Sequence, residues 1–156
     1  MTCTPNWNVA TASERQVCLA ERVISESGFY VRYAETDAMG IVHHANYIVY
    51  FEEGRSNYMR ERGSDYASFE RSGHYLTVTE VNARYLKPAA YGQRVGVRCW
   101  IEEMRSRGLT FAYEIIDADT RDLLVTGWTK HICITHDGRV TTLPVEWRAW
   151  GEKHTP

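Results

Sequence analysis

The chain has 156 residues, which is enough for one domain with a substantial core and too few for two comfortable ones. Its hydrophobic content of 44% and its formal net charge of -2 are typical of a soluble globular protein and exclude a broadly basic nucleic-acid-binding surface. No apolar run reaches the ~20 residues that a membrane helix needs, and the N-terminus lacks the basic and apolar regions of a secretory signal.

The cysteines give no sign of a metal or redox motif. Cys3, Cys18, Cys99 and Cys133 form no C-x-x-C pair, which weakens zinc and thioredoxin-type interpretations. A disulfide stays open as an alternative. Free thiols in a reducing cytoplasm are the simpler interpretation, and the sequence is assigned to the cytoplasm on this basis.

Residues 1–27 are interpreted as an N-terminal extension. The tetrapeptide Ser-Glu-Arg-Gln at 13–16 could form a capping box that opens a short helix. The alternative is an extended segment in which Trp7 docks on the rest of the protein.

The first part of the predicted domain reads as a strand, a turn and a helix. An extended segment opens at Val31 and is followed by turn chemistry over residues 36–40, where an aspartate can bond nearby backbone. The apolar period then becomes helical from about Asn46, and Arg60 in the last turn suits the helix dipole. Gly63 is well placed as the residue that ends the helix.

The remainder of the chain predicts strands joined by tight turns. A short helix or turn after Gly63 precedes alternating apolar and polar residues. The predicted strands cover residues 75–86, 95–102, 109–115 and 123–135, and residues 144–147 form a terminal helical turn. Lys87-Pro88 stops the first of these strands. With the opening strand, these make an antiparallel sheet of about five strands beside one long amphipathic helix, which is an α+β domain over residues 28–147 with a polar tail at 148–156.

A candidate site lies where the predicted turn meets the predicted helix. Asp37 precedes a helix whose first N–H groups have no partner within the helix, and His43 and His44 occupy the approach. A carboxylate, an imidazole and free N–H donors are the groups that acyl transfer requires. On turn chemistry alone, Asp37 would read as a residue that bonds its own backbone.

The segment Y-A-E-T-D-A-M-G-I-V-H-H-A-N-Y resembles the signature of a known family. It is similar to that of the hotdog-fold acyl-CoA thioesterases of the 4-hydroxybenzoyl-CoA thioesterase type, in particular the branch of Tol–Pal-associated acyl-CoA thioesterases. The pattern T-D-x-x-G-x-V-x-H-x-N-Y is long and mixed in character, and the resemblance extends from about Phe29 to Glu146. It implies the hotdog fold, a curved antiparallel sheet wrapped around one long central helix.

The resemblance assigns roles to residues of this segment. It implies that Asp37 is the catalytic carboxylate, as nucleophile or as general base, and that His44 orients the aspartate or water while its N–H polarises the thioester carbonyl. Tyr33 matches a tyrosine near the site, with a packed strand tyrosine as the alternative. Asn46 is expected to be the helix N-cap and, with Tyr47, to border the substrate.

Other residues near the motif suit less specific roles. The hypothesis that His43 binds a metal ion is weak, because no further candidate ligand stands at a spacing typical of metal sites. We expect His43 to make a contact with neighbouring residues instead. The turn Arg105-Ser106-Arg107 is the predicted site for coenzyme A phosphates, with solvated charges as the alternative and Arg84 and Lys87 as weaker candidates.

The resemblance implies an acyl-CoA thioesterase that needs no metal or organic cofactor and that releases a carboxylic acid and coenzyme A. Two alternatives stay open: hydrolysis of an acyl-carrier-protein thioester, and a non-catalytic acyl-CoA-binding hotdog protein. Similar enediyne polyketide thioesterases typically carry asparagine where this chain has Asp37, which favours the acyl-CoA type. The acyl group is left open, and a homodimer or homotetramer with sites at subunit interfaces is expected.

Overall fold

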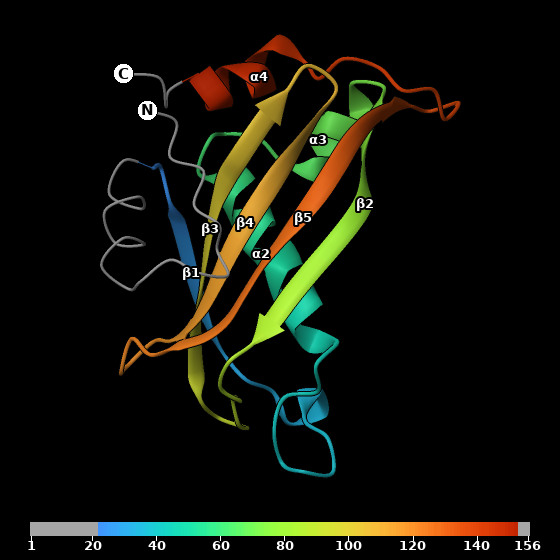
Figure 1. Cartoon of the computed structure of the whole chain (residues 1–156). Helices are drawn as coiled ribbons and strands as arrows, with labels where there is room; N and C mark the ends of the chain where they lie inside the picture. The colour runs from blue at the N-terminus through green and yellow to red at the C-terminus, as the bar shows by residue number, and fades with distance from the viewer. Residues whose placement is uncertain (1–21, 153–156) are drawn as a thin grey trace.

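The computed structural model describes residues 22–152, in which a curved five-stranded antiparallel sheet packs against α2 (Figure 1). The strand order is β1-β3-β4-β5-β2. The strands are β1 (Ser25–Tyr30), β2 (His74–Tyr85), β3 (Arg94–Arg105), β4 (Gly108–Asp117) and β5 (Leu123–Thr135). The helices are the 3-10 helix η1 (Tyr33–Glu35) and the α-helices α2 (Asn46–Arg60), α3 (Tyr66–Arg71) and α4 (Val145–Glu152).

Four of the predicted strands are confirmed, and the opening one is shifted. β2 to β5 coincide with the segments of period two, whereas the first strand is Ser25–Tyr30 rather than a segment that opens at Val31. The chain leaves the sheet there, and Thr36 closes a 3-10 turn by donating from both its N–H and its hydroxyl to the carbonyl of Tyr33. The predicted helix at residues 13–16 lies outside the described residues.

Helix α2 lies directly on the sheet because a glycine faces it. A Cβ on Gly54 would lie 2.6 Å from Cγ1 of Val97, so only glycine permits this approach. One turn earlier, Phe51 stacks on Tyr113 with ring centroids 4.4 Å apart. The sequence predicted one long central helix, but α2 has 15 residues and is accompanied by α3 and α4.

The core between α2 and the sheet is rich in aromatic residues. The apolar stripe predicted for α2 is buried there, comprising Tyr50, Phe51, Tyr58 and Met59. Burial of this stripe removes most of the apolar surface of the helix from water, which is the main source of stability for a helix of this length.

None of the described helices is long and apolar enough to cross a membrane.

The predicted polar tail begins too early, because α4 continues to residue 152. Trp147 is buried, and Trp150, one helical turn later, packs against the core with its ring centroid 4.6 Å from that of Trp147. Phe69 of α3 contacts the same cluster. The spacing of the two tryptophans places them on one face of a helix, which is why the chain stays helical past residue 147.

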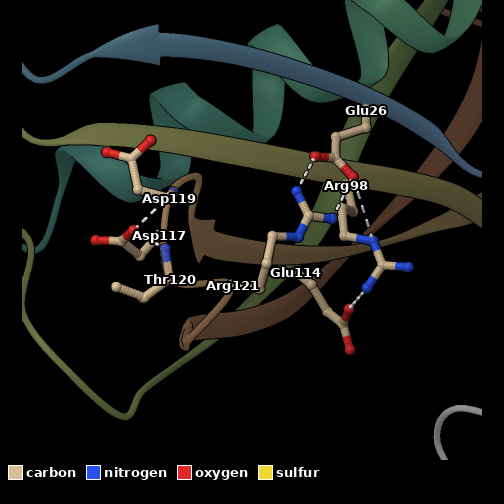
Figure 2. Close-up of polar contacts among 7 residues, drawn as sticks. All are labelled: Glu26, Arg98, Glu114, Asp117, Asp119, Thr120 and Arg121. Carbon is tan, nitrogen blue, oxygen red and sulfur yellow. Dashed lines mark hydrogen bonds and ion pairs between the residues drawn. The ribbon is translucent and has the colours of Figure 1, made fainter.

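An ion-pair network ties the other face of the sheet together (Figure 2). Arg98 of β3 pairs with Glu114 of β4 at 2.9 Å and with Glu26 of β1 at 3.7 Å. Arg121, in the turn between β4 and β5, donates two hydrogen bonds to Glu26 at 2.6 and 2.9 Å, and its φ is +65°. These contacts hold the β4–β5 turn against the edge strand β1.

Candidate active site

A pocket of about 320 Å³ opens where the turn after η1, the start of α2 and the end of β2 meet. Its polar walls come from Asp37, His44 and Lys87, and its apolar walls include Met39, Tyr47 and Tyr85. A mostly apolar pocket with a few converging polar groups is the usual form of a small-molecule site.

Asp37 is held by the turn that contains it. Its Oδ1 accepts a hydrogen bond of 2.8 Å from the N–H of Met39, and Gly40 follows with a φ of +76°. The backbone of Asp37 is bonded on both sides, to Ile41 and to Gly40, at 2.9 Å. Within the described part of the chain, Oδ2 has no hydrogen-bond partner. Asp37 is therefore a turn residue that also offers one carboxylate oxygen to the pocket.

The two adjacent histidines differ in what they contact. Nδ1 of His43 accepts a hydrogen bond of 3.2 Å from the N–H of Ala45, which agrees with the local contact expected for His43. The ring of His44 lines the pocket and lies edge-on to Tyr85, whose hydroxyl donates to the carbonyl of His44 at 3.1 Å. Residues 22–152 contain no cluster of three or more candidate metal ligands.

The expected N-cap role of Asn46 is wrong. Asn46 is the first residue of α2, and the cap position is Ala45, whose backbone is already helical and whose side chain offers no cap. The Asn46 side chain instead donates from Nδ2 to the carbonyl of Glu35 at 2.8 Å. Among the described residues, the N–H of His44, two residues before α2 begins, has no acceptor, whereas the N–H of Asn46 donates to the carbonyl of His43 at 2.9 Å.

Tyr47 and Tyr33 occupy different environments. Tyr47 is buried, lines the pocket, and accepts a hydrogen bond of 3.0 Å from the N–H of Ala89 on its hydroxyl. Tyr33 is 77% exposed, packs edge-on against Tyr91 and is not among the residues that line the pocket. The structure therefore brings Tyr47 to the candidate site and does not bring Tyr33 there.

The predicted phosphate turn, between β3 and β4, lies at the opposite end of the sheet from the loop that follows η1 and contains Asp37 (Figure 1). The loop after Asp37 pairs with Ala90, just before β3 begins, whereas Arg105 ends β3 and begins the turn. The 12 residues of β3 span roughly 40 Å at about 3.3 Å each. Arg105 is exposed and pairs with Glu103 at 2.8 Å. One copy of the chain does not bring these arginines to its own Asp37.

Sequence reasoning did not single out Tyr85, which lines the pocket, or Glu35, which lies behind the pocket wall and contacts the approach to α2. Tyr85 is the last residue of β2 and lines the pocket. The alternation of side chains along the strand predicts which face of the sheet Tyr85 occupies, but not that a pocket opens there. Glu35 lies inside the motif and is 6% exposed, yet a glutamate beside a turn ordinarily reads as a solvated charge. In the sequence, the one indication of a special role for Glu35 was its position inside the motif.

Comparison with known proteins places these features in a family context. The family model of the thioesterase-like superfamily matches residues 31–151. The chain is 35% identical over 133 residues to a putative acyl-CoA thioesterase, YneP, of Bacillus subtilis, covering 85% of this chain and 94% of that protein.

Solved structures share the fold. A hypothetical protein, TT1821, from Thermus thermophilus has a TM-score of 0.79 and 35% identity, and the alignment covers 86% of this chain and 100% of that one. A DHNA-CoA thioesterase from Staphylococcus aureus has a TM-score of 0.77 and 34% identity, with coverage of 84% and 88%.

Proposed function

Because the chain belongs to the thioesterase-like superfamily, we propose that it hydrolyses an acyl-CoA thioester to a carboxylic acid and coenzyme A, with Asp37 as the catalytic carboxylate. The observation that carries this proposal is the pocket in which the carboxylate of Asp37 and the ring of His44 converge beside the start of α2. The likeness to a putative acyl-CoA thioesterase over nearly its whole length supports it.

The reaction follows from the groups at the pocket. Either Asp37 removes a proton from a water that attacks the carbonyl carbon, or Asp37 attacks that carbon itself and water then cleaves the resulting anhydride. In both routes the C–S bond breaks and the thiolate of coenzyme A takes up a proton. The N–H of His44 stabilises the charge that develops on the carbonyl oxygen, because the N–H groups of Asn46 and Ile48 at the start of α2 already donate to the carbonyls of His43 and Ala45.

The apolar part of the pocket receives the acyl group. Met39, Tyr47, Tyr85 and Leu86 form its walls, which suit an alkyl chain or an aromatic ring. Tyr33 is left out of this proposal, because its ring is exposed outside the pocket.

The free buried thiols of Cys99 and Cys133 suit a reducing cytoplasm as the place of action.

A panel of thioesters tests the function directly. Fatty acyl-, benzoyl- and naphthoyl-CoA, together with an acyl-carrier-protein thioester, are incubated with the protein, and the released thiol is measured with a chromogenic reagent. We expect at least one acyl-CoA to be hydrolysed roughly a millionfold or more faster than it hydrolyses spontaneously, the lower end of ordinary enzymatic acceleration. Turnover of the carrier-protein thioester alone would favour the first alternative, and binding without turnover would favour a non-catalytic protein.

The site is proposed to be completed by a second copy of the chain. β2 is an edge strand with exposed Val78, Val81 and Tyr85, and such an edge invites pairing. Two β2 strands paired antiparallel about a twofold axis would place the Arg105–Arg107 turn of one copy beside Asp37 of the other. The pantetheine arm, about as long as four extended residues or roughly 14 Å, cannot bridge the length of β3 within one chain.

Mixed dimers test this arrangement. Arg105→Ala combined with Arg107→Ala is expected to raise KM for acyl-CoA roughly five- to tenfold with kcat nearly unchanged, the scale of exposed charge-assisted contacts. A heterodimer of this variant with Asp37→Asn, isolated through two affinity tags, is then expected to show the wild-type KM and about half of the wild-type kcat. Only one of its two sites pairs an intact Asp37 with intact arginines.

Other results would contradict this assembly. A heterodimer with the raised KM would mean that the arginines serve their own chain. A monomeric mass by light scattering at micromolar concentration would remove the second copy altogether. An unchanged KM in the double arginine variant would move the phosphate site elsewhere, with Lys87 at the pocket as the next candidate.

A further inference from the structure

The buried carboxylate of Glu35 connects the two halves of the candidate site. Its Oε2 accepts hydrogen bonds of 2.8 Å from the hydroxyl of Tyr50, in α2, and from the N–H of Arg32. Its Oε1 accepts from Nε and Nη2 of Arg32 at 3.0 and 2.5 Å. A carboxylate that is only 6% exposed but has four donors is fully compensated for its burial.

The backbone of Glu35 makes a second set of contacts to the helix start. Its carbonyl accepts from Nδ2 of Asn46, the first residue of α2, and from the N–H of His43, both at 2.8 Å. Asp37 follows only two residues later. One residue therefore holds the strand exit, the approach to the helix and the second turn of α2 together.

The charges of this cluster agree with the geometry. Burial by itself raises the pKa of Glu35, but the hydrogen bonds from Arg32 and Tyr50 outweigh it, and the pKa lies below its ordinary value. Burial, together with the neighbouring Glu35, raises the pKa of Tyr50. Near neutral pH, Glu35 is thus an ionised acceptor and Tyr50 is a neutral donor.

We propose that Glu35 is a positioning residue, which sets where the carboxylate of Asp37 lies relative to the N–H of His44 just before α2. This inference rests on the proposed function. Small displacements of catalytic groups cost rate rather than binding, because only the transition state needs the full arrangement. Glu35 does not line the pocket, so substrate binding should be largely insensitive to it.

Two substitutions test the role of Glu35. Glu35→Gln keeps the shape but turns an N–H group toward the donors, and Tyr50→Phe removes one hydrogen bond. Each is expected to lower kcat about tenfold or more while KM stays within twofold, measured well below the melting temperature. Their effects should be less than additive in the double variant, because both act through one contact. The acidic limb of the pH profile should stay where wild type has it, because Glu35 is not the reacting base.

Glu53→Gln is the matched control. Glu53 lies on the exposed side of α2 and pairs with Arg60 at 2.6 Å, so the same change of charge occurs away from the site. It should leave both kinetic constants unchanged.

The inference would be overturned if Glu35→Gln and Tyr50→Phe each kept kcat within twofold of wild type. A rise in KM that matches the fall in kcat, or a shifted acidic limb, would also overturn it. Failure of the proposed function looks different: wild type would then hydrolyse no acyl-CoA of the panel, or Asp37→Asn would retain turnover, whatever the Glu35 variants do.

Discussion

Replacing Asp37 with asparagine is expected to leave the fold intact while kcat falls by about two orders of magnitude or more, the usual scale for a positioned base. Asparagine keeps an oxygen for the N–H of Met39 and is itself a good turn former, so the turn should survive. What it removes is the second, unbonded carboxylate oxygen and its basicity. The measurement is thermal melting together with turnover of the best acyl-CoA.

His44→Ala is the companion variant. It should lose less activity than Asp37→Asn, because the backbone N–H that serves the oxyanion remains after the ring is removed. If Asp37→Asn melts like wild type and retains most of its turnover, the proposed mechanism is wrong and the carboxylate is only a part of the turn.

Acid is expected to destabilise the protein through a buried histidine. His131 is 3% exposed, and its Nε2 lies 2.7 Å from the hydroxyl of Thr129, which in turn lies 2.6 Å from that of Tyr113. Within the described residues, Nδ1 of His131 has no partner. Burial, and next the charge of Arg55, lower the pKa of His131 to about 3.

The sign of the effect follows from proton uptake. Between pH 6.5 and about 3, the unfolded chain holds a proton on His131 that the folded chain does not, so folding stability falls as the pH falls through that window. The slope approaches roughly 1.4 kcal/mol per pH unit once the unfolded histidine is mostly protonated, which gives about 2 kcal/mol between pH 6.5 and 4.5. That is a large part of the roughly 5–15 kcal/mol typical of a domain.

The test is urea unfolding at several pH values. His131→Gln should flatten the pH dependence of the free energy of unfolding, although Glu35, whose pKa is also lowered, leaves some acid sensitivity in place. His136→Gln, a change at an exposed histidine in the turn after β5 whose Nε2 lies 2.9 Å from the carbonyl of Glu70, is the comparison variant for the loss of a histidine that is not buried. Equal slopes in wild type and His131→Gln would show that His131 is not the buried titrating group.

The helix boundaries illustrate how far local patterns reach. The start of α2 at Asn46 is as predicted, because the change of apolar period marks it. The N-cap role was assigned wrongly to Asn46. Its side chain donates to the carbonyl of Glu35 instead, and the backbone of Ala45 is already helical, and both features depend on how residues before the helix fold. The end of α4 was missed because its apolar face has only two tryptophans to signal it.

Local patterns along the chain were enough to predict the strands β2 to β5, the amphipathic α2 and the motif that contains Asp37 and His44. Each of these features depends on residues that are close together in the sequence, so the side-chain period and the turn residues are enough to predict them. The folded chain was needed to show that Tyr85 lines the pocket and that Tyr33 does not. It was also needed to show that Arg105 lies a strand length away from Asp37. Such distances depend on strand register and on how closely α2 packs on the sheet, and no local pattern records either.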